Sequence, residues 1–202
     1  MANIRWKENS LVNITVSPET HTLALLKRSP YAWFFDVRRK QAWDELDLPE
    51  LKPLFCIGIV NAVLNKMATK PIDPKRISSS VNNFLSELAI PKPWIKPHQN
   101  TADWNVDNFP FRGGKLIELN PNIGSLDSPV LKENLDVTRD RIVVEHCELT
   151  TMWADQDLTD RLTRFFDKGI NRDDLKFEIF PELWNDREKL RPLTRRLPLP
   201  LR

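Results

Sequence analysis

The chain has 202 residues, of which 41% are hydrophobic and 29% charged, so it can bury a core and does not have the composition of a disordered protein. The net charge of +2 is unevenly distributed, because residues 185–202 hold six basic and two acidic residues and leave the other 184 residues at −2. This distribution excludes a protein that is basic over its whole surface, as a general nucleic-acid binder would be.

The first residues, MANIRWKENSLVN, place Arg5, Lys7 and Glu8 where a signal peptide needs an uninterrupted apolar stretch. No segment reaches the roughly 20 consecutive apolar residues of a membrane span. We therefore expect a soluble, cytoplasmic protein that does not engage a membrane.

Strand patterns dominate the first sixty residues. Residues Ser10–Val16 alternate apolar and polar side chains with β-branched residues, and Ser17-Pro18 closes this strand. Residues Tyr31–Val37 form an aromatic run that favours a strand. The apolar run from Leu54 to Leu64 predicts a buried strand as far as about Val60.

Two amphipathic helices are predicted. The first opens at Asp73-Pro74, where Asp73 can cap the helix and proline suits the first helical position. The second runs from about Asp157 to Lys168 and ends at Gly169, with Asp155 and Asp157 as anions that the helix dipole favours. The apolar stripes that identify these helices are Ile77, Val81, Phe84, Leu85 and Leu88 in the first, and Leu158, Leu162, Phe165 and Phe166 in the second.

The remaining segments are extended or irregular. Three prolines in Ile90–Pro97 predict an extended connector on the surface. A turn at Gly113-Gly114 leads into a predicted strand over Lys115–Leu119, and Arg141–Leu149 alternates enough to be a further strand. Residues 185–202, rich in Leu, Pro and Arg, form either an extended arm or a flexible tail.

Strands and helices do not alternate regularly, so the pattern indicates an α+β fold rather than a doubly wound sheet. We expect a mostly antiparallel sheet with two or more packed amphipathic helices. These elements are predicted to form a single domain over residues 1–184, followed by the basic arm over residues 185–202.

Motifs for catalysis and for metal or cofactor binding are weak. The Gly113-Gly114 pair lacks the spacing of a phosphate-binding loop. On the predicted strand, His146 and Glu148 share one face, but two ligands fall short of the three or four that zinc requires. We expect no catalytic residue, no cofactor and no metal, and hence a protein that is not an enzyme.

The two cysteines, Cys56 and Cys147, cannot build a disulfide framework. Both lie in apolar, strand-like runs, where a buried free thiol is the ordinary state, although one bridge between them stays open.

Two interpretations of partner binding compete. A nucleic-acid partner would use the basic arm and Trp94, which lies among Lys92, Lys96 and His98. A solvated tail or a packed arm explains the same residues without any nucleic acid. We therefore treat nucleic-acid binding as the alternative function.

A protein partner is favoured by two segments in which acids surround a tryptophan, an arrangement typical of an interface for a basic partner. The structural alternative for each segment is a core tryptophan beside solvated charges. The candidate partner-binding residues are Trp43, Asp44, Glu45, Asp47 and Glu50 in the first segment and Trp153, Asp155 and Asp157 in the second.

Two stretches, SPYAWFFDV…LFCIGIVNAVLNK and CELTTMWADQDLTDRLTRFFDKGIN, resemble immunity proteins of bacterial polymorphic-toxin and contact-dependent inhibition systems. The resemblance covers about residues 28–70 and 145–172, and neither residues 90–129 nor the arm have a counterpart. It implies a non-enzymatic cytoplasmic antidote that binds and blocks a cognate toxin domain, and it supplies no catalytic residues.

Overall fold

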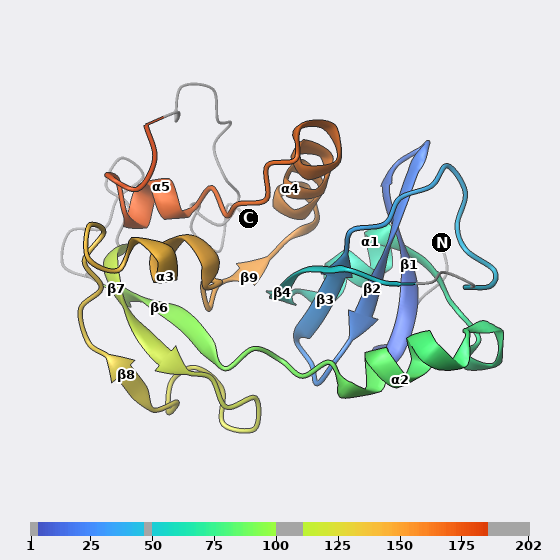
Figure 1. Cartoon of the computed structure of the whole chain (residues 1–202), viewed down its shortest axis with the longest axis horizontal. Helices are drawn as coiled ribbons and strands as arrows, with labels where there is room; N and C mark the ends of the chain where they lie inside the picture. Colours follow the sequence, from blue (N-terminus) through green and yellow to red (C-terminus); the bar gives the residue numbers. More distant parts are fainter. Residues whose placement is uncertain (1–3, 47–49, 100–110, 186–202) are drawn as a thin grey trace. The chain divides into compact units, whose positions relative to one another are not determined.

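The computed structural model of the chain describes residues 4–46, 50–99 and 111–185, which pack as two compact units (Figure 1). The first unit comprises residues up to 90 together with 152–171, and the second comprises residues 91–151 together with those from 172 onward. The chain thus passes between the units three times, and the stretch predicted as one domain contributes to both. Of the arm predicted over residues 185–202, only Asn185 lies within the described residues.

The first unit is built on a six-stranded sheet in the order β5-β1-β2-β3-β4-β9. All pairings are antiparallel except that of β4 with β9, so the expected α+β class and mostly antiparallel sheet are confirmed. The strands are β1 (Ser10–Ser17), β2 (Thr20–Leu26), β3 (Tyr31–Phe35), β4 (Pro53–Ile59), β5 (Ala68–Pro71) and β9 (Met152–Trp153).

Both faces of this sheet carry a hydrophobic core, because successive side chains of a strand point to opposite faces. Helices α1 (Asn61–Met67) and α4 (Asp155–Lys168) add to one core, and α2 (Ser79–Glu87) adds to the other. The α4-side core includes Val12, Ile14, Phe34, Ile57, Trp153, Leu158 and Leu162. The α2-side core includes Leu11, Leu23, Leu25, Phe35, Trp43, Leu46, Val81 and Leu85.

The helix expected from Asp73 is divided in two, and the prediction of its start is therefore wrong. Asp73 does cap a turn, since its carboxylate accepts a hydrogen bond from the backbone N–H of Lys75 at 3.0 Å. That turn is only the short 3-10 helix η1 (Pro74–Arg76), and α2 begins at Ser79.

Pairing with a distant loop causes this interruption. Ile77 has extended backbone angles, φ −108° and ψ 131°, and forms a parallel bridge with Leu46. The backbone N–H of Leu46 donates to the Arg76 carbonyl at 2.8 Å, and that of Ser78 donates to the Leu46 carbonyl at 3.1 Å. A tertiary contact thus overrides a continuous helical stripe in the sequence.

Helix α4 is confirmed, with its start two residues before the predicted one. Gly169 ends it with φ 70°, a left-handed conformation that glycine adopts without a steric penalty. None of the helices within residues 4–46, 50–99 and 111–185 is both long and apolar enough to cross a membrane.

The second unit holds a three-stranded antiparallel sheet in the order β6-β7-β8. Its strands are β6 (Pro93–Gln99), β7 (Phe111–Glu118) and β8 (Val130–Lys132). The expected surface connector Ile90–Pro97 is corrected here, because its C-terminal half is strand β6 with Trp94 and Ile95 buried. Its prolines are tolerated because β6 is an edge strand, where a missing backbone donor costs little.

The expected turn at Gly113-Gly114 is a second correction, since both glycines lie inside β7. Gly113 has φ 67°, and a Cβ added to Gly114 would lie 2.9 Å from the Ile95 Cγ2 atom. Glycine is needed here for a left-handed backbone and for close approach of β6, rather than for a chain reversal.

The strand expected over Arg141–Leu149 is a helix, α3 (Arg141–His146). A turn at Asp136 precedes this helix. The Asp136 side chain stabilises the turn by accepting hydrogen bonds from the N–H groups of Thr138 and Arg139 at 3.0 and 2.7 Å. Val144 is the one fully buried residue of α3 and packs in a core shared with the short helix α5 (Lys176–Ile179). Local hydrogen bonding and packing of one face outweigh the β-branched run in the sequence.

Candidate functional site

The first tryptophan–acid segment, residues 43–50, is fixed to the sheet by Trp43. This residue is 4% exposed and packs in the α2-side core. The buried Asn13 side chain accepts a hydrogen bond from the Trp43 N–H at 2.6 Å and donates one to its carbonyl at 3.0 Å. Trp43 therefore anchors its own loop, and its ring is not presented to a partner.

The acids of this segment lie on the surface. Asp44, Glu45 and Glu50 are exposed, whereas Asp47 lies outside the described residues. Asp44 forms an ion pair with Lys70, whose hydrogen bond and charge hold the pKa of this carboxyl below its ordinary value, with smaller contributions from Arg76 and Arg39. The surface around Asp44 is therefore of mixed charge.

The second tryptophan–acid segment, around Trp153, is more buried than the first. Trp153 on β9 is 1% exposed and belongs to the α4-side core. The Arg161 guanidinium lies 3.8 Å from the Phe55 ring centroid and 5.2 Å from that of Trp153, a cation–π arrangement inside the unit. Trp153 is therefore a core residue in this structure.

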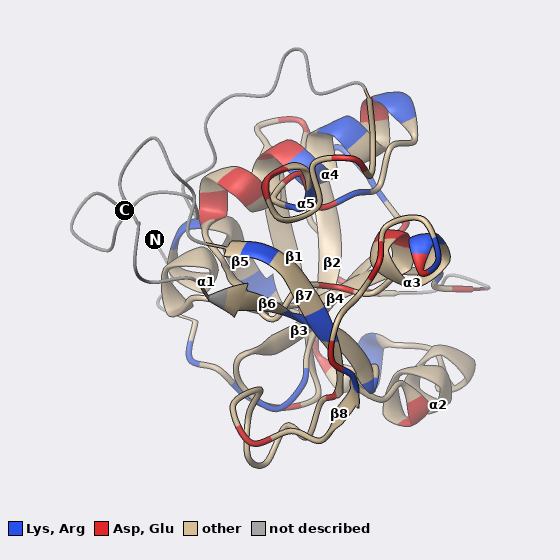
Figure 2. Cartoon of the chain, turned by 90° about the vertical axis from the view of Figure 1, so that its left-hand side faces the viewer, with Lys and Arg blue, Asp and Glu red and all other residues tan. Residues whose placement is uncertain are grey.

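Asp155 and Asp157 occupy the first turn of α4, where the helix dipole favours anions (Figure 2). Asp155 pairs with Lys66 at 3.0 Å, and its side chain is 25% exposed. Asp157 is only 2% exposed. Both acids thus stabilise the N-terminus of α4, and Asp157 does not face solvent.

The structure does not bring the two segments together. Trp43 packs on the α2 side of the sheet, and Trp153 packs on the α4 side. The two tryptophans therefore cannot form one aromatic patch, and the exposed acids of residues 44–50 are the part of the predicted set that is open to a partner.

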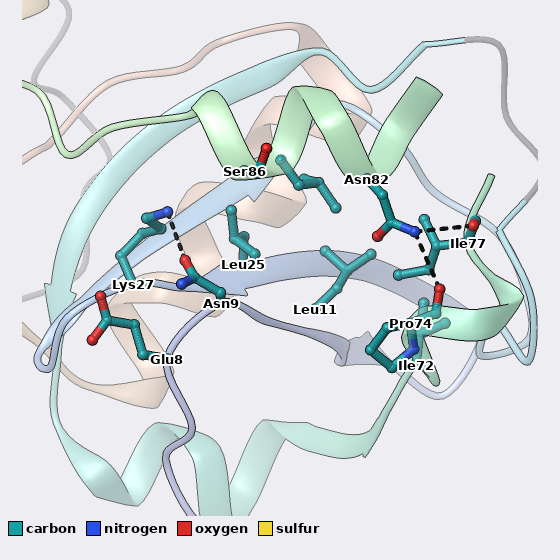
Figure 3. Close-up of a pocket in the computed structure, with 11 residues that line it drawn as sticks. Glu8, Asn9, Leu11, Leu25, Lys27, Ile72, Pro74, Ile77, Asn82 and Ser86 are labelled. Carbon is teal, nitrogen blue, oxygen red and sulfur yellow. Dashed lines mark hydrogen bonds between the residues drawn. The ribbon is translucent and has the colours of Figure 1, made fainter. Parts of the chain in front are cut away.

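A groove that the sequence did not indicate lies between α2 and the ends of β1 and β2 (Figure 3). We call it the α2 groove, and its cavity volume is about 280 Å³. Its floor is apolar and consists of Leu11, Leu25, Ile72, Ile77 and Leu85, and its rim consists of Glu8, Asn9, Lys27, Pro74, Asn82 and Ser86.

The rim is held by specific hydrogen bonds. At one end, Lys27 Nζ donates to Asn9 Oδ1 at 2.7 Å, beside Glu8 (Figure 3). At the other end, Asn82 Nδ2 donates to the carbonyls of Pro74 and Ile77, each at 3.1 Å. These contacts fix polar groups around an apolar floor, so the groove can take an apolar side chain and hydrogen-bond the backbone that carries it.

The chain matches, over residues 1–185, the model of a family described as a domain of unknown function, DUF8309. The chain belongs to the DUF8309 family. The matched residues include the whole α2 groove, the first compact unit and the second unit as far as residue 185. No curated protein and no solved structure matches the chain.

Sequence reasoning missed the α2 groove of this DUF8309 member for a physical reason. Its residues come from positions 8–11, 25–27, 72–77 and 82–86, and they meet only through strand pairing and the packing of α2. The break between η1 and α2, which sets the groove's far end, depends on Leu46 and has no local signal.

The thiols and the histidine singled out in the sequence occupy separate positions in this DUF8309 chain. Cys56 is buried and Cys147 half-buried, and neither forms a disulfide. Burial raises the pKa of the Cys147 thiol, Glu148 adds to this, and Lys176 opposes it. His146 belongs to α3, so the face it was expected to share with Glu148 on a strand does not exist.

Within the described ranges, no three His, Cys, Asp or Glu side chains converge in a way that could hold a metal ion.

Proposed function

We propose that the chain is an immunity-type protein that binds a cognate bacterial toxin domain and neutralises it by covering the toxin's active site or substrate cleft. In this proposal it acts in the cytoplasm by binding alone, without catalytic residues, cofactor or metal. The observation that carries the proposal is the α2 groove, which lies in the unit that holds most of the residues resembling immunity proteins.

The α2 groove has the composition of a small interface core. Interfaces place a few apolar anchors in desolvated pockets and surround them with polar groups that exclude water and fix the register. Leu11 and Leu25 supply an apolar floor, and Glu8, Lys27 and Ser86 supply a polar rim of both charges. A toxin segment with one apolar anchor side chain suits this groove.

The exposed acids of residues 44–50 have a separate role in the proposal. Charges at the rim of an interface mainly accelerate association, because they steer the partner before contact. Asp44 and Glu45 stand on a loop that Asn13 and Trp43 fix to the sheet, so their positions are set before the partner arrives. A basic toxin surface would be attracted there.

The alternative, a nucleic-acid partner, has less support. The aromatic residue proposed for base stacking, Trp94, is 1% exposed, and its indole N–H donates to the Pro91 carbonyl at 2.7 Å. The basic arm lies outside the described residues apart from Asn185. We therefore keep the protein partner as the proposed function.

The test is to co-express the chain with the toxin encoded by the adjacent upstream gene, purify the complex and measure its dissociation constant by calorimetry. Ser86→Trp places a large side chain at the groove rim, and we expect it to weaken binding by about tenfold or more, since loss of a buried anchor contact costs at least about 1.4 kcal/mol. Ser80→Trp, at an exposed position of the same helix outside the groove, is the matched control and should bind normally.

The outcomes distinguish an error in the proposed function from an error in the proposed contact surface. If no complex forms and expression gives no protection against the toxin, the proposed function is wrong. If the complex forms but Ser86→Trp binds like its parent while Asp44→Lys and Glu45→Lys lose affinity, the function stands and the acidic loop replaces the groove as the contact surface.

A further inference from the structure

The second unit contains a pocket of a different character, with a cavity volume of about 360 Å³, on the sheet of β6 and β7. Its polar lining consists of Lys96, His98, Lys115, Thr150 and Thr151. We call it the basic pocket; among the described residues, no Asp or Glu lines it. The basic positions of β6 and β7 are blue in Figure 2.

We propose that the basic pocket binds the phosphate group of a small organic phosphate, independently of any toxin. The first reason is the strand register, which places Lys96 directly opposite Lys115 in the antiparallel pair. Like charges at directly opposed positions destabilise a sheet. A dianion between the two ammonium groups removes that repulsion.

The two ammonium groups are only loosely engaged within the protein. Lys96 Nζ reaches the Leu126 carbonyl at 3.4 Å, and Lys115 Nζ lies 3.7 Å from the Glu133 carboxylate. Both distances exceed the roughly 2.7–2.9 Å of a charge-assisted hydrogen bond. The Glu133 side chain is 66% exposed, so a bound anion can compete with it for Lys115.

A third nitrogen adds to the site. His98 follows Lys96 by two residues on β6, so their side chains share one face of the strand. The His98 Nε2 atom is buried and has no hydrogen-bond partner among the described residues. Burying a polar atom without a partner is costly, so a hydrogen bond from this atom to a ligand oxygen, reached by rotation of the His98 ring, would stabilise the bound state.

The two threonine hydroxyls come from a distant part of the chain. The Ile95 N–H donates to the Glu148 carbonyl at 2.8 Å, and the Thr150 N–H donates to the Ile95 carbonyl at 2.9 Å. This bridge lays Thr150 and Thr151 beside β6. Their hydroxyls suit phosphate oxygens, which accept several hydrogen bonds at once.

The lining also indicates what carries the phosphate. Pro97 and Phe111 complete the pocket with apolar surface that a free inorganic ion would leave in contact with water. Two lysines match a terminal phosphomonoester, with a charge of about −1.5 to −2 near neutral pH, better than the single charge of a backbone phosphodiester. The ligand class is therefore a small organic phosphomonoester.

Calorimetry on the full chain with adenosine 5′-monophosphate, adenosine and inorganic phosphate tests this inference. We expect the monophosphate to bind, adenosine not to bind, and inorganic phosphate to bind more weakly. Lys96→Gln and Lys115→Gln should each weaken binding of the monophosphate by about tenfold or more, because each removes a charged hydrogen bond. Lys92→Gln, which removes a surface lysine paired with Glu118 outside the pocket, should leave binding unchanged.

Thermal unfolding without ligand gives an independent readout, since removing one of two opposed lysines should leave the chain at least as stable as its parent. The inference is overturned if adenosine binds as well as its monophosphate, if no phosphate compound binds, or if Lys92→Gln weakens binding as much as Lys96→Gln. A single-stranded oligonucleotide without a terminal phosphate that binds these lysines more tightly than the monophosphate would also overturn it. None of these measurements involves the toxin, so they leave the proposed function untouched.

Discussion

Residues 43–50 and 153–160 are similar in composition, because each places an acid within two residues after a tryptophan, but the two segments have different structures. Both tryptophans are buried, on opposite faces of one sheet. In the first segment the chain continues as a loop, and Asp44 and Glu45 are exposed. In the second it continues as helix α4, and Asp157 is buried in its first turn.

The element that follows the tryptophan therefore determines whether the acids are buried or exposed. An acid in the first turn of a helix interacts favourably with the helix dipole and is drawn into the fold. An acid on a loop has no such partner and stays available to the surface. The following predictions test whether this contrast holds.

The largest effect is expected from Trp153→Ala, because it removes a side chain that is 1% exposed from the α4-side core. Truncation of a buried tryptophan costs about 3–5 kcal/mol of unfolding free energy. Urea denaturation measures the loss, and Met152→Ala, whose side chain is 38% exposed on the same strand, is the control with little expected change. A loss below about 1 kcal/mol would show that Trp153 is not a core residue.

Asn13→Ala should have the next largest effect, because it leaves the buried N–H and carbonyl of Trp43 without their side-chain partners. An orphaned buried pair of this kind costs about 2–3 kcal/mol. Chemical denaturation of Asn65→Ala, an exposed asparagine on α1, provides the comparison and should differ little from the parent. Equal stability of the two variants would mean that the Trp43 loop is not fixed by Asn13.

Asp157→Ala should destabilise the chain by about 2 kcal/mol, because it removes an anion that interacts favourably with the helix dipole from a buried position in the first turn of α4. Asp155→Ala, which removes a partly exposed ion pair with Lys66, should cost about 1 kcal/mol or less. The same denaturation assay gives both values. The reverse order would contradict the contrast between buried and solvent-facing acids within this segment.

The smallest effect is expected from Asp44→Asn at neutral pH, since the carboxylate is exposed. The folded pKa of Asp44 lies below its unfolded value because of the hydrogen bond and charge of Lys70. Its stabilising contribution is therefore present above the unfolded pKa and is lost as the pH falls through the folded pKa. The stability difference between parent and variant should shrink as the pH is lowered in thermal scans, and a difference that grows toward acid would contradict this assignment.

Part of the fold could be predicted because its signals are local. Strands β1, β3 and β4 and helix α4 show the alternation or helical spacing of their own residues. Helix α3 could not be predicted in this way, because its sequence alternates like a strand while the Asp136 turn and the packing of Val144 favour a helix.

The sites were harder to predict because they depend on pairing between distant residues. The burial of Trp43 depends on Asn13, thirty residues away, and the α2 groove joins four separate stretches of chain. The opposed lysines of the basic pocket depend on the register of β6 with β7. A single sequence shows which residues are present but not which strand position lies opposite which.

Hydrogen–deuterium exchange of the chain with and without its cognate toxin domain tests the central claim, that the first unit binds the toxin through the α2 groove. We expect the toxin to slow amide exchange in α2 and around residues 8–11 and 25–27, the segments that line the groove. Slowed exchange confined to the second unit, or no change in the first unit at a toxin concentration that saturates binding, would contradict it.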